Sequence, residues 1–204
     1  MAGHAAIADV GLTLVELLRD RMGSSITDEE IVLASPGAEG AGDDFRLTLY
    51  LYDVSRNEHL SNEHRPPDDP TERPGNSLAL DLHYLLTAHA KDGSSDPPTT
   101  KTTEQHTVLG RAMQVFQDNA IVRTPELSGD LTAGDEVTVS VEPVSREDVV
   151  NIWTTFSDDP YEPSIPYVVS PVIIESERTV PVDRVLDAEF SAFTFRTTGG
   201  DDEP

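Results

Sequence analysis

Asn76-Ser-Leu-Ala-Leu-Asp-Leu-His-Tyr-Leu-Leu-Thr-Ala-His-Ala90 is the most informative stretch of this chain, and Thr107-Val-Leu-Gly-Arg-Ala-Met-Gln-Val-Phe116 follows it after a threonine-rich loop. In the first segment leucines alternate with Ala79, Asp81 and His83, which is typical of a strand with one buried face. In the second segment apolar residues recur at helical spacing, namely Val108, Leu109, Ala112, Met113 and Phe116. The sequence therefore predicts a strand over 78–88 and a helix over 104–119 that packs on it.

Further elements extend outward from this pair. Ile7 to Met22 has an apolar stripe at helical spacing and is followed by Gly23, a common helix stop. Alternating residues predict strands over 45–54 and 137–141. Ser145 is well placed to cap a short helix that contains Val149, Ile152, Trp153 and Phe156. The order of these elements predicts an α/β fold with a single mixed or antiparallel sheet flanked by helices.

Prolines and polar runs mark the remaining segments. The run 164–176 is extended but contains two prolines, so we expect a strand at a sheet edge or one broken by a bulge. Three polar segments are predicted to be loops: 57–76, 91–103 and 125–134. We expect one α/β domain over 1–178 and a C-terminal extension over 179–204, whose end is disordered.

Composition excludes several classes of partner. The 204 residues carry a formal net charge of −24 and no cysteine, so nucleic acid and anionic membranes are disfavoured and thiolate chemistry is absent. No apolar run reaches the roughly 20 residues that span a bilayer, and we expect a soluble protein without a conventional export signal. Lys91 and Lys101 are the two lysines, and this scarcity beside 38 acidic residues suggests adaptation to high salt and a halophilic source. An ordinary acidic protein is the alternative.

Candidate catalytic chemistry is weak. Asp81 and His83 would share one face of a strand, but a metal centre needs a third protein donor, so we expect hydrogen-bonded structural roles for both. A metal-dependent enzyme of unknown reaction built on these two residues is the alternative. No serine lies in a Gly-x-Ser-x-Gly elbow and no glycine-rich segment resembles a phosphate loop, so no catalytic, cofactor-binding or metal residue is predicted.

Two apolar segments are candidates for contacts with a partner or another subunit. Trp153 and Phe156 could anchor an interface, although core packing by an amphipathic helix is the simpler interpretation. The extended run could pair with a neighbouring sheet through an open edge, or could pair within its own chain. Its candidate interface residues are Tyr167, Val168, Val169, Val172, Ile173 and Ile174.

Several blocks of the sequence, taken in order, resemble one family. The blocks are Ile7-Ala8-Asp9-Val10, Leu49-Tyr50-Leu51-Tyr52-Asp53-Val54, Leu80-Asp-Leu-His-Tyr-Leu-Leu-Thr87, Leu109-Gly-Arg-Ala-Met-Gln114, Val141-Glu142-Pro143-Val144-Ser145 and Tyr167-Val168-Val169-Ser170-Pro171-Val172. They are similar to segments of cap, or tail-terminator, proteins of phage-tail-like contractile injection systems. The acidity and the enlarged loops 57–76 and 91–103 depart from the usual pattern.

The resemblance implies a structural role rather than a reaction. It implies a tail-terminator-like fold and a homo-hexameric ring that caps the distal end of the inner tube and sheath and ends their polymerisation. The sheath protein and the inner tube protein would then be partners. It also implies assembly in the cytoplasm within a particle that can be released extracellularly. A baseplate or adaptor component of the same particle is the alternative.

Overall fold

A computed structural model describes residues 3–23, 26–39, 41, 44–60, 72–91, 95–123, 136–156 and 159–181. Its main feature is a six-stranded sheet with the strand order β1-β2-β4-β7-β6-β5. The strands are β1 (Ile31–Leu33), β2 (Leu47–Arg56), β4 (Leu78–Ala88), β5 (Ile121–Arg123), β6 (Glu136–Val141) and β7 (Ser164–Ile174). The strands β1 and β2 run parallel, whereas every other neighbouring pair is antiparallel. The predicted α/β fold with one mixed sheet is confirmed.

The strand β4 has the bounds that its alternation predicted. It pairs with β2 along one side and with β7 along the other, so it lies at the centre of the sheet. Its even-numbered residues Leu82, Tyr84 and Leu86 are each at most 1% exposed. Burial of such side chains contributes about 1.5–3 kcal/mol each relative to an exposed position.

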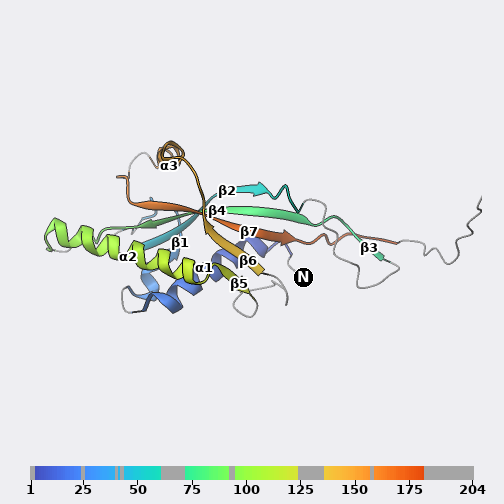
Figure 1. Cartoon of the computed structure of the whole chain (residues 1–204), viewed down its shortest axis with the longest axis horizontal. Helices are drawn as coiled ribbons and strands as arrows, with labels where there is room; N and C mark the ends of the chain where they lie inside the picture. The colour runs from blue at the N-terminus through green and yellow to red at the C-terminus, as the bar shows by residue number, and fades with distance from the viewer. Residues whose placement is uncertain are drawn as a thin grey trace, which may run out of the picture.

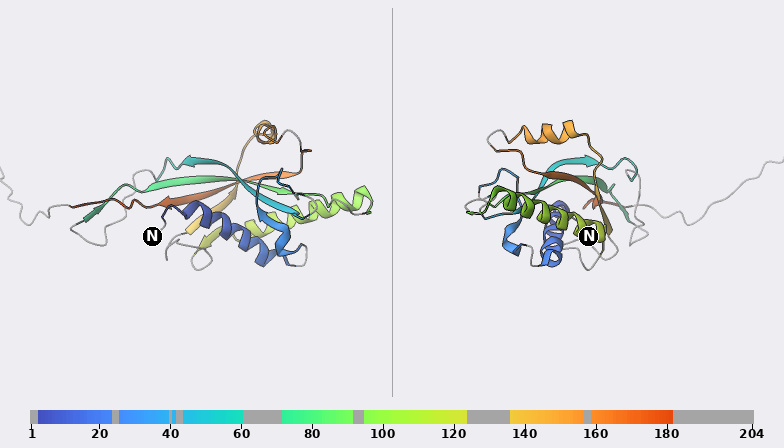
Figure 2. Two further views of the ribbon diagram at one scale, coloured as in Figure 1. Left: turned by 180° about the vertical axis from the view of Figure 1, so that it is seen from behind. Right: turned by 60° about the vertical axis from the view of Figure 1, so that its left-hand side comes forward.

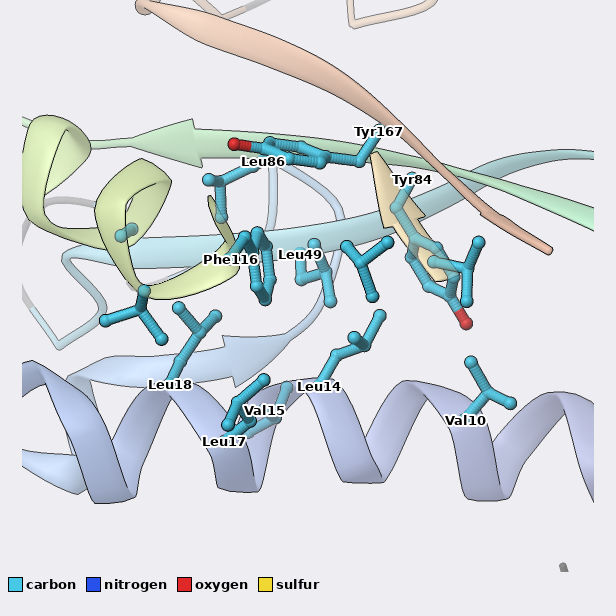
Figure 3. Packing of buried hydrophobic residues seen from close by; sticks show 14 of the residues in the cluster. Val10, Leu14, Val15, Leu17, Leu18, Leu49, Tyr84, Leu86, Phe116 and Tyr167 are labelled. Atoms are coloured by element: carbon cyan, nitrogen blue, oxygen red, sulfur yellow. The ribbon is translucent and has the colours of Figure 1, made fainter. Parts of the chain in front are cut away.

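Two helices cover the face of the sheet that carries these side chains. The helix α1 (Ala6–Met22) turns Val10, Leu14 and Leu18 toward the sheet, and α2 (Pro98–Asp118) adds Phe116 beside them (Figure 3). The ring of Phe116 meets Tyr167 of β7 edge-on, with 5.0 Å between the ring centroids. These contacts form one continuous hydrophobic core between sheet and helices.

A third helix, α3 (Arg146–Trp153), lies on the opposite side of the sheet from α1 and α2 (Figure 1). Ser145 caps it as predicted: its hydroxyl accepts a hydrogen bond from the Asp148 amide at 3.2 Å, and the Asp148 carboxylate accepts one from the Ser145 amide at 3.2 Å. Such a capping box satisfies donors that the first turn of a helix leaves unpaired. The rest of this sheet face has no helix over it in the described part of the chain (Figure 2).

The structure differs from the sequence prediction at the start of α2. The predicted loop ended at Thr103, whereas the helix begins at Pro98. Proline suits the first helical position because its fixed φ matches the helix and its missing N–H has no partner there anyway. The buried Gln105 side chain donates a hydrogen bond to the Ala88 carbonyl at 2.8 Å and ties this helix to the end of β4.

Two β-bulges and a short ribbon shape the far end of the sheet. The β2–β4 register shifts between Leu51 and Asp53, and the β4–β7 register shifts between Leu80 and Leu82. Farther out, β3 (Glu72–Pro74) pairs antiparallel with β8 (Thr179–Pro181). The strand β3 lies within the segment predicted as an excursion, and β8 lies within the predicted C-terminal extension; the division at residue 178 stays a prediction.

The segment predicted as loop over 125–134, most of 57–76 and the predicted disordered end lie outside the described residues. In the parts that the structure describes, no helix combines the length and apolar character needed to cross a bilayer.

Candidate assembly interface

The tryptophan proposed as a partner anchor lies inside the chain. Trp153 at the end of α3 is 6% exposed, and its indole Nε1 donates a hydrogen bond to the Ser164 hydroxyl at 3.2 Å. Its ring packs against Phe156 and Tyr161 with centroid distances of 5.9 Å and 5.4 Å. Phe156, which is half-buried, also meets Tyr50 of β2 at 5.5 Å. The cluster therefore fastens α3 to the sheet, while a role of Trp153 and Phe156 in partner binding stays a prediction.

The predicted edge position of the extended run is wrong for Tyr167 to Ser170, which have a neighbouring strand on both sides. The strand β7 lies between β4 and β6, and β6 pairs with residues Tyr167 to Ser170. The alternative, a bulge, is confirmed: Leu80 faces Val172 but Leu82 faces Val169, so β7 carries one extra residue there. Pro171 lies in this irregular segment, where a residue without an N–H is tolerated. Past Ser170, β7 pairs with no described strand on the side that faces away from β4.

Burial divides the six candidate residues of β7 into two groups. Tyr167, Val169 and Val172 are at most 3% exposed and belong to the core of the chain itself. Val168, Ile173 and Ile174 keep part of their surface accessible. An interface role for β7 stays a prediction, and these three side chains are the ones that a partner can reach without rearrangement of the core.

A polar network occupies the sheet face that lacks α1 and α2. His83 of β4 lies with Nδ1 3.0 Å from a Glu142 carboxylate oxygen and Nε2 2.9 Å from the Ser55 hydroxyl. The Tyr52 hydroxyl donates to the same Glu142 oxygen at 2.6 Å. Burial, and then this hydrogen bond to a carboxylate, raise the pKa of Tyr52 above its usual range. The network therefore links β2 and β4 to the residue that follows β6.

Asp81 belongs to a second part of this network. Its carboxylate accepts a hydrogen bond from the Asn57 amide at 2.8 Å and another from the Ser170 hydroxyl. The hydrogen bonds expected for Asp81 and His83 are present, and each joins β4 to a neighbouring segment. A purely structural role for the two side chains stays a prediction. Within the described ranges no group of three histidine, aspartate or glutamate side chains could hold a metal ion.

A groove that sequence reasoning missed lies between α2 and the strands β6 and β7. Its volume is about 270 Å³, and it is lined by Met113, Gln114, Phe116, Gln117, Val139, Ser140, Val141 and Tyr167. Val141 at the end of β6 is 51% exposed, although it continues an alternation whose other valines are buried. Burial raises the pKa of Tyr167 to about 12. The valine alternation was visible in the sequence, but the approach of α2 to it was not.

One known protein family matches most of the chain. A family model described as the Pvc16 N-terminal domain matches residues 9–187. None of the curated proteins compared with the chain matches it.

Two solved structures share the fold. One, described as the sheath/tube terminator of the extracellular contractile injection system PVC in its extended state, superposes with a TM-score of 0.62 at 16% identity and covers 95% of this chain. The other, described as the tube terminating cap of the anti-feeding prophage AFP, gives a TM-score of 0.62 at 17% identity and covers 91% of this chain. The chain spans 65% and 61% of the length of these two chains.

Proposed function

This chain belongs to the Pvc16 N-terminal domain family, and from that premise we propose that it is a structural assembly protein that terminates the tube and sheath of a contractile injection system. The single observation that supports this most is the family match over residues 9–187. The two solved proteins that share the fold are themselves described as a sheath/tube terminator and a tube terminating cap. The role requires protein surfaces rather than a reaction centre.

The proposed arrangement is a ring of six copies at the distal end of the particle. A ring with the same six-fold symmetry as the layers beneath it would place each copy over an equivalent site. One ring would then contact both the inner tube protein and the sheath protein. The outer face of this ring would offer no docking site for a further layer, and polymerisation would thereby end. We further propose that the particle is assembled in the cytoplasm and acts outside the cell.

The absence of enzymatic activity is part of this proposal. The polar side chains that sequence analysis considered for catalysis, Asp81 and His83, are held by hydrogen bonds to Asn57, Ser170 and Ser55. Those bonds hold neighbouring strands together, and such a rigid sheet suits a protein that docks on a finished polymer.

Charge sets a condition on the ring. Six copies at −24 each would carry 6 × −24 = −144 formal charges. Repulsion between exposed charges is largely screened at about 1 M salt, where the Debye length is about 3 Å. We propose that ring formation strengthens with salt concentration, as a halophilic source would require.

Particle length provides the test. Deletion of the gene should broaden the length distribution of particles measured by electron microscopy, and expression of the wild-type chain from a plasmid should restore a narrow one. Particles of normal, uniform length after deletion would refute termination. Labelling of the chain in intact particles separates the alternatives, because a label at the baseplate end would support a baseplate or adaptor component instead.

A further inference from the structure

We propose that residues 182–193, which follow β8 and lie outside the described residues, dock as an amphipathic helix on the outer end of the sheet and cover Leu78 and Ile174 of their own chain. The face that they would cover is the one that α1 and α2 cover farther in. The inference concerns a contact within one copy, so it does not depend on the proposed function.

The apolar face of the sheet continues past its helical cover. Leu80 and Val172 face each other across β4 and β7 and are 7% and 1% exposed. One step farther out on the same face Leu78 pairs with Ile174, but Leu78 is 43% exposed and Ile174 is only partly buried. A cross-strand pair of large apolar side chains is thus left open directly beside buried neighbours.

The helix α1 ends too early to cover this pair. Val10 lies below the ring of Tyr84 (Figure 3), and from Val10 the helix continues only to Ala6. Those four residues span about 6 Å of helix, whereas the six residues from Tyr84 to Leu78 span about 20 Å of strand. The outer pair therefore lies well beyond the first turn of α1.

The segment after β8 has the pattern of a helix with one apolar side. The matching family model continues to residue 187, so the first half of the segment belongs to the family's domain. Three of its four charged residues fall outside the apolar stripe. An isolated helix of about 12 residues is marginal in water, so it requires an apolar surface on which to dock. The residues of the stripe recur at helical spacing and are Val182, Val185, Leu186, Phe190 and Phe193.

Length and position favour the same chain over a second copy as the partner of this segment. The pairing of β3 with β8 fixes the point where the segment begins. The seven residues from Ile174 to Pro181 span at most about 23 Å of extended chain, and a helix over 182–193 spans about 18 Å. A helix that folds back from Pro181 would thus bring Phe193 close to Leu78. Because the tether is short, the effective concentration of the segment at this site far exceeds that of a second copy in dilute solution.

Thiol reactivity measures this cover in the full chain. The chain has no cysteine, so Leu78→Cys and Val150→Cys each carry one thiol. The two native side chains are 43% and 46% exposed, so without a docked segment both thiols should react with a maleimide at similar rates. With the segment docked, Leu78→Cys should react at least 10-fold more slowly than Val150→Cys. Equal rates would overturn the inference.

Substitutions within the segment show whether it provides the protection. Phe193→Asp in the Leu78→Cys chain should raise the reaction rate at least 10-fold with the circular dichroism spectrum retained. Ser191→Asp is the matched control, because residue 191 falls on the other side of the proposed helix, and it should leave the rate unchanged. Protection that survives Phe190→Asp and Phe193→Asp together would overturn the inference, since another segment would then cover the thiol.

Protein concentration separates docking within one chain from docking between copies. The protection of Leu78→Cys should be the same at every concentration, because the segment and its site belong to one molecule. A reaction rate that falls as the protein concentration rises would assign the cover to a second copy and overturn the inference. The particle-length test of the proposed function is independent of either result.

Discussion

Replacement of Trp153 by alanine separates its two possible roles, structural anchor and partner contact. The side chain is 6% exposed, packs against Phe156 and Tyr161 and donates a hydrogen bond to Ser164. Removal of a buried tryptophan side chain costs about 3–5 kcal/mol. For a chain of about 200 residues 1 kcal/mol corresponds to about 2–4 °C, so the melting temperature of Trp153→Ala should fall by about 10 °C.

The assay is thermal unfolding of the purified chain followed by circular dichroism, at one fixed salt concentration. Trp153→Phe keeps an aromatic ring but loses the donor to Ser164, so it should lose about 1–2 kcal/mol. Val150→Ala on the same helix is the control, because Val150 is 46% exposed and its truncation should cost less than about 0.5 kcal/mol. If Trp153→Ala melts with the wild type yet fails to assemble, the burial argument is refuted and the tryptophan acts on a partner.

Three further outcomes are expected. Tyr52→Phe should lose about 1 kcal/mol in denaturant unfolding, because it removes the hydrogen bond to Glu142; a gain in stability would show that the bond is not favourable. Burial raises the pKa of Glu30, but hydrogen bonds from Thr27 and the nearby cations Arg46 and Lys91 together hold it below its usual range, so its stabilisation is present above the unfolded-state pKa and is lost as pH falls. Glu30→Gln should therefore reduce the loss in free energy of unfolding at acidic pH by about 0.5 kcal/mol. The same pH dependence of the unfolding free energy in both proteins would contradict this. The wild-type melting temperature should rise from dilute buffer to about 1 M salt; equal values would end the halophilic hypothesis.

The elements with regular apolar spacing were predictable from sequence. The bounds of β4 follow from its alternation, and those of α1 follow from an apolar stripe that ends before Gly23. Ser145 was identifiable as a cap because its type and its position before an acidic turn are local properties. Local patterns report local backbone geometry, and for that reason these predictions agree with the structure.

The position of a strand within the sheet is a different kind of property. The prolines of β7 suggested an edge strand. At the bulge near Pro171, however, regular pairing is interrupted, so the N–H that proline lacks is not needed there and the strand can lie inside the sheet. The groove beside β6 likewise depends on where α2 crosses, which spacing does not encode. The threonines that begin α2 were predicted as part of a polar loop, whereas Pro98 suits the first helical position and the helix begins there.

The paired register shifts in β2 and β7 have a consequence for how the family can vary. Each irregularity places one extra residue in its strand, so deletion of that residue would remove the bulge and leave the rest of the strand in register with β4. Val172 would stay opposite Leu80 on the core face. A single deletion in a regular part of either strand would instead turn the residues beyond it to the opposite face, so these strands can lose one residue at a bulge but only pairs of residues elsewhere.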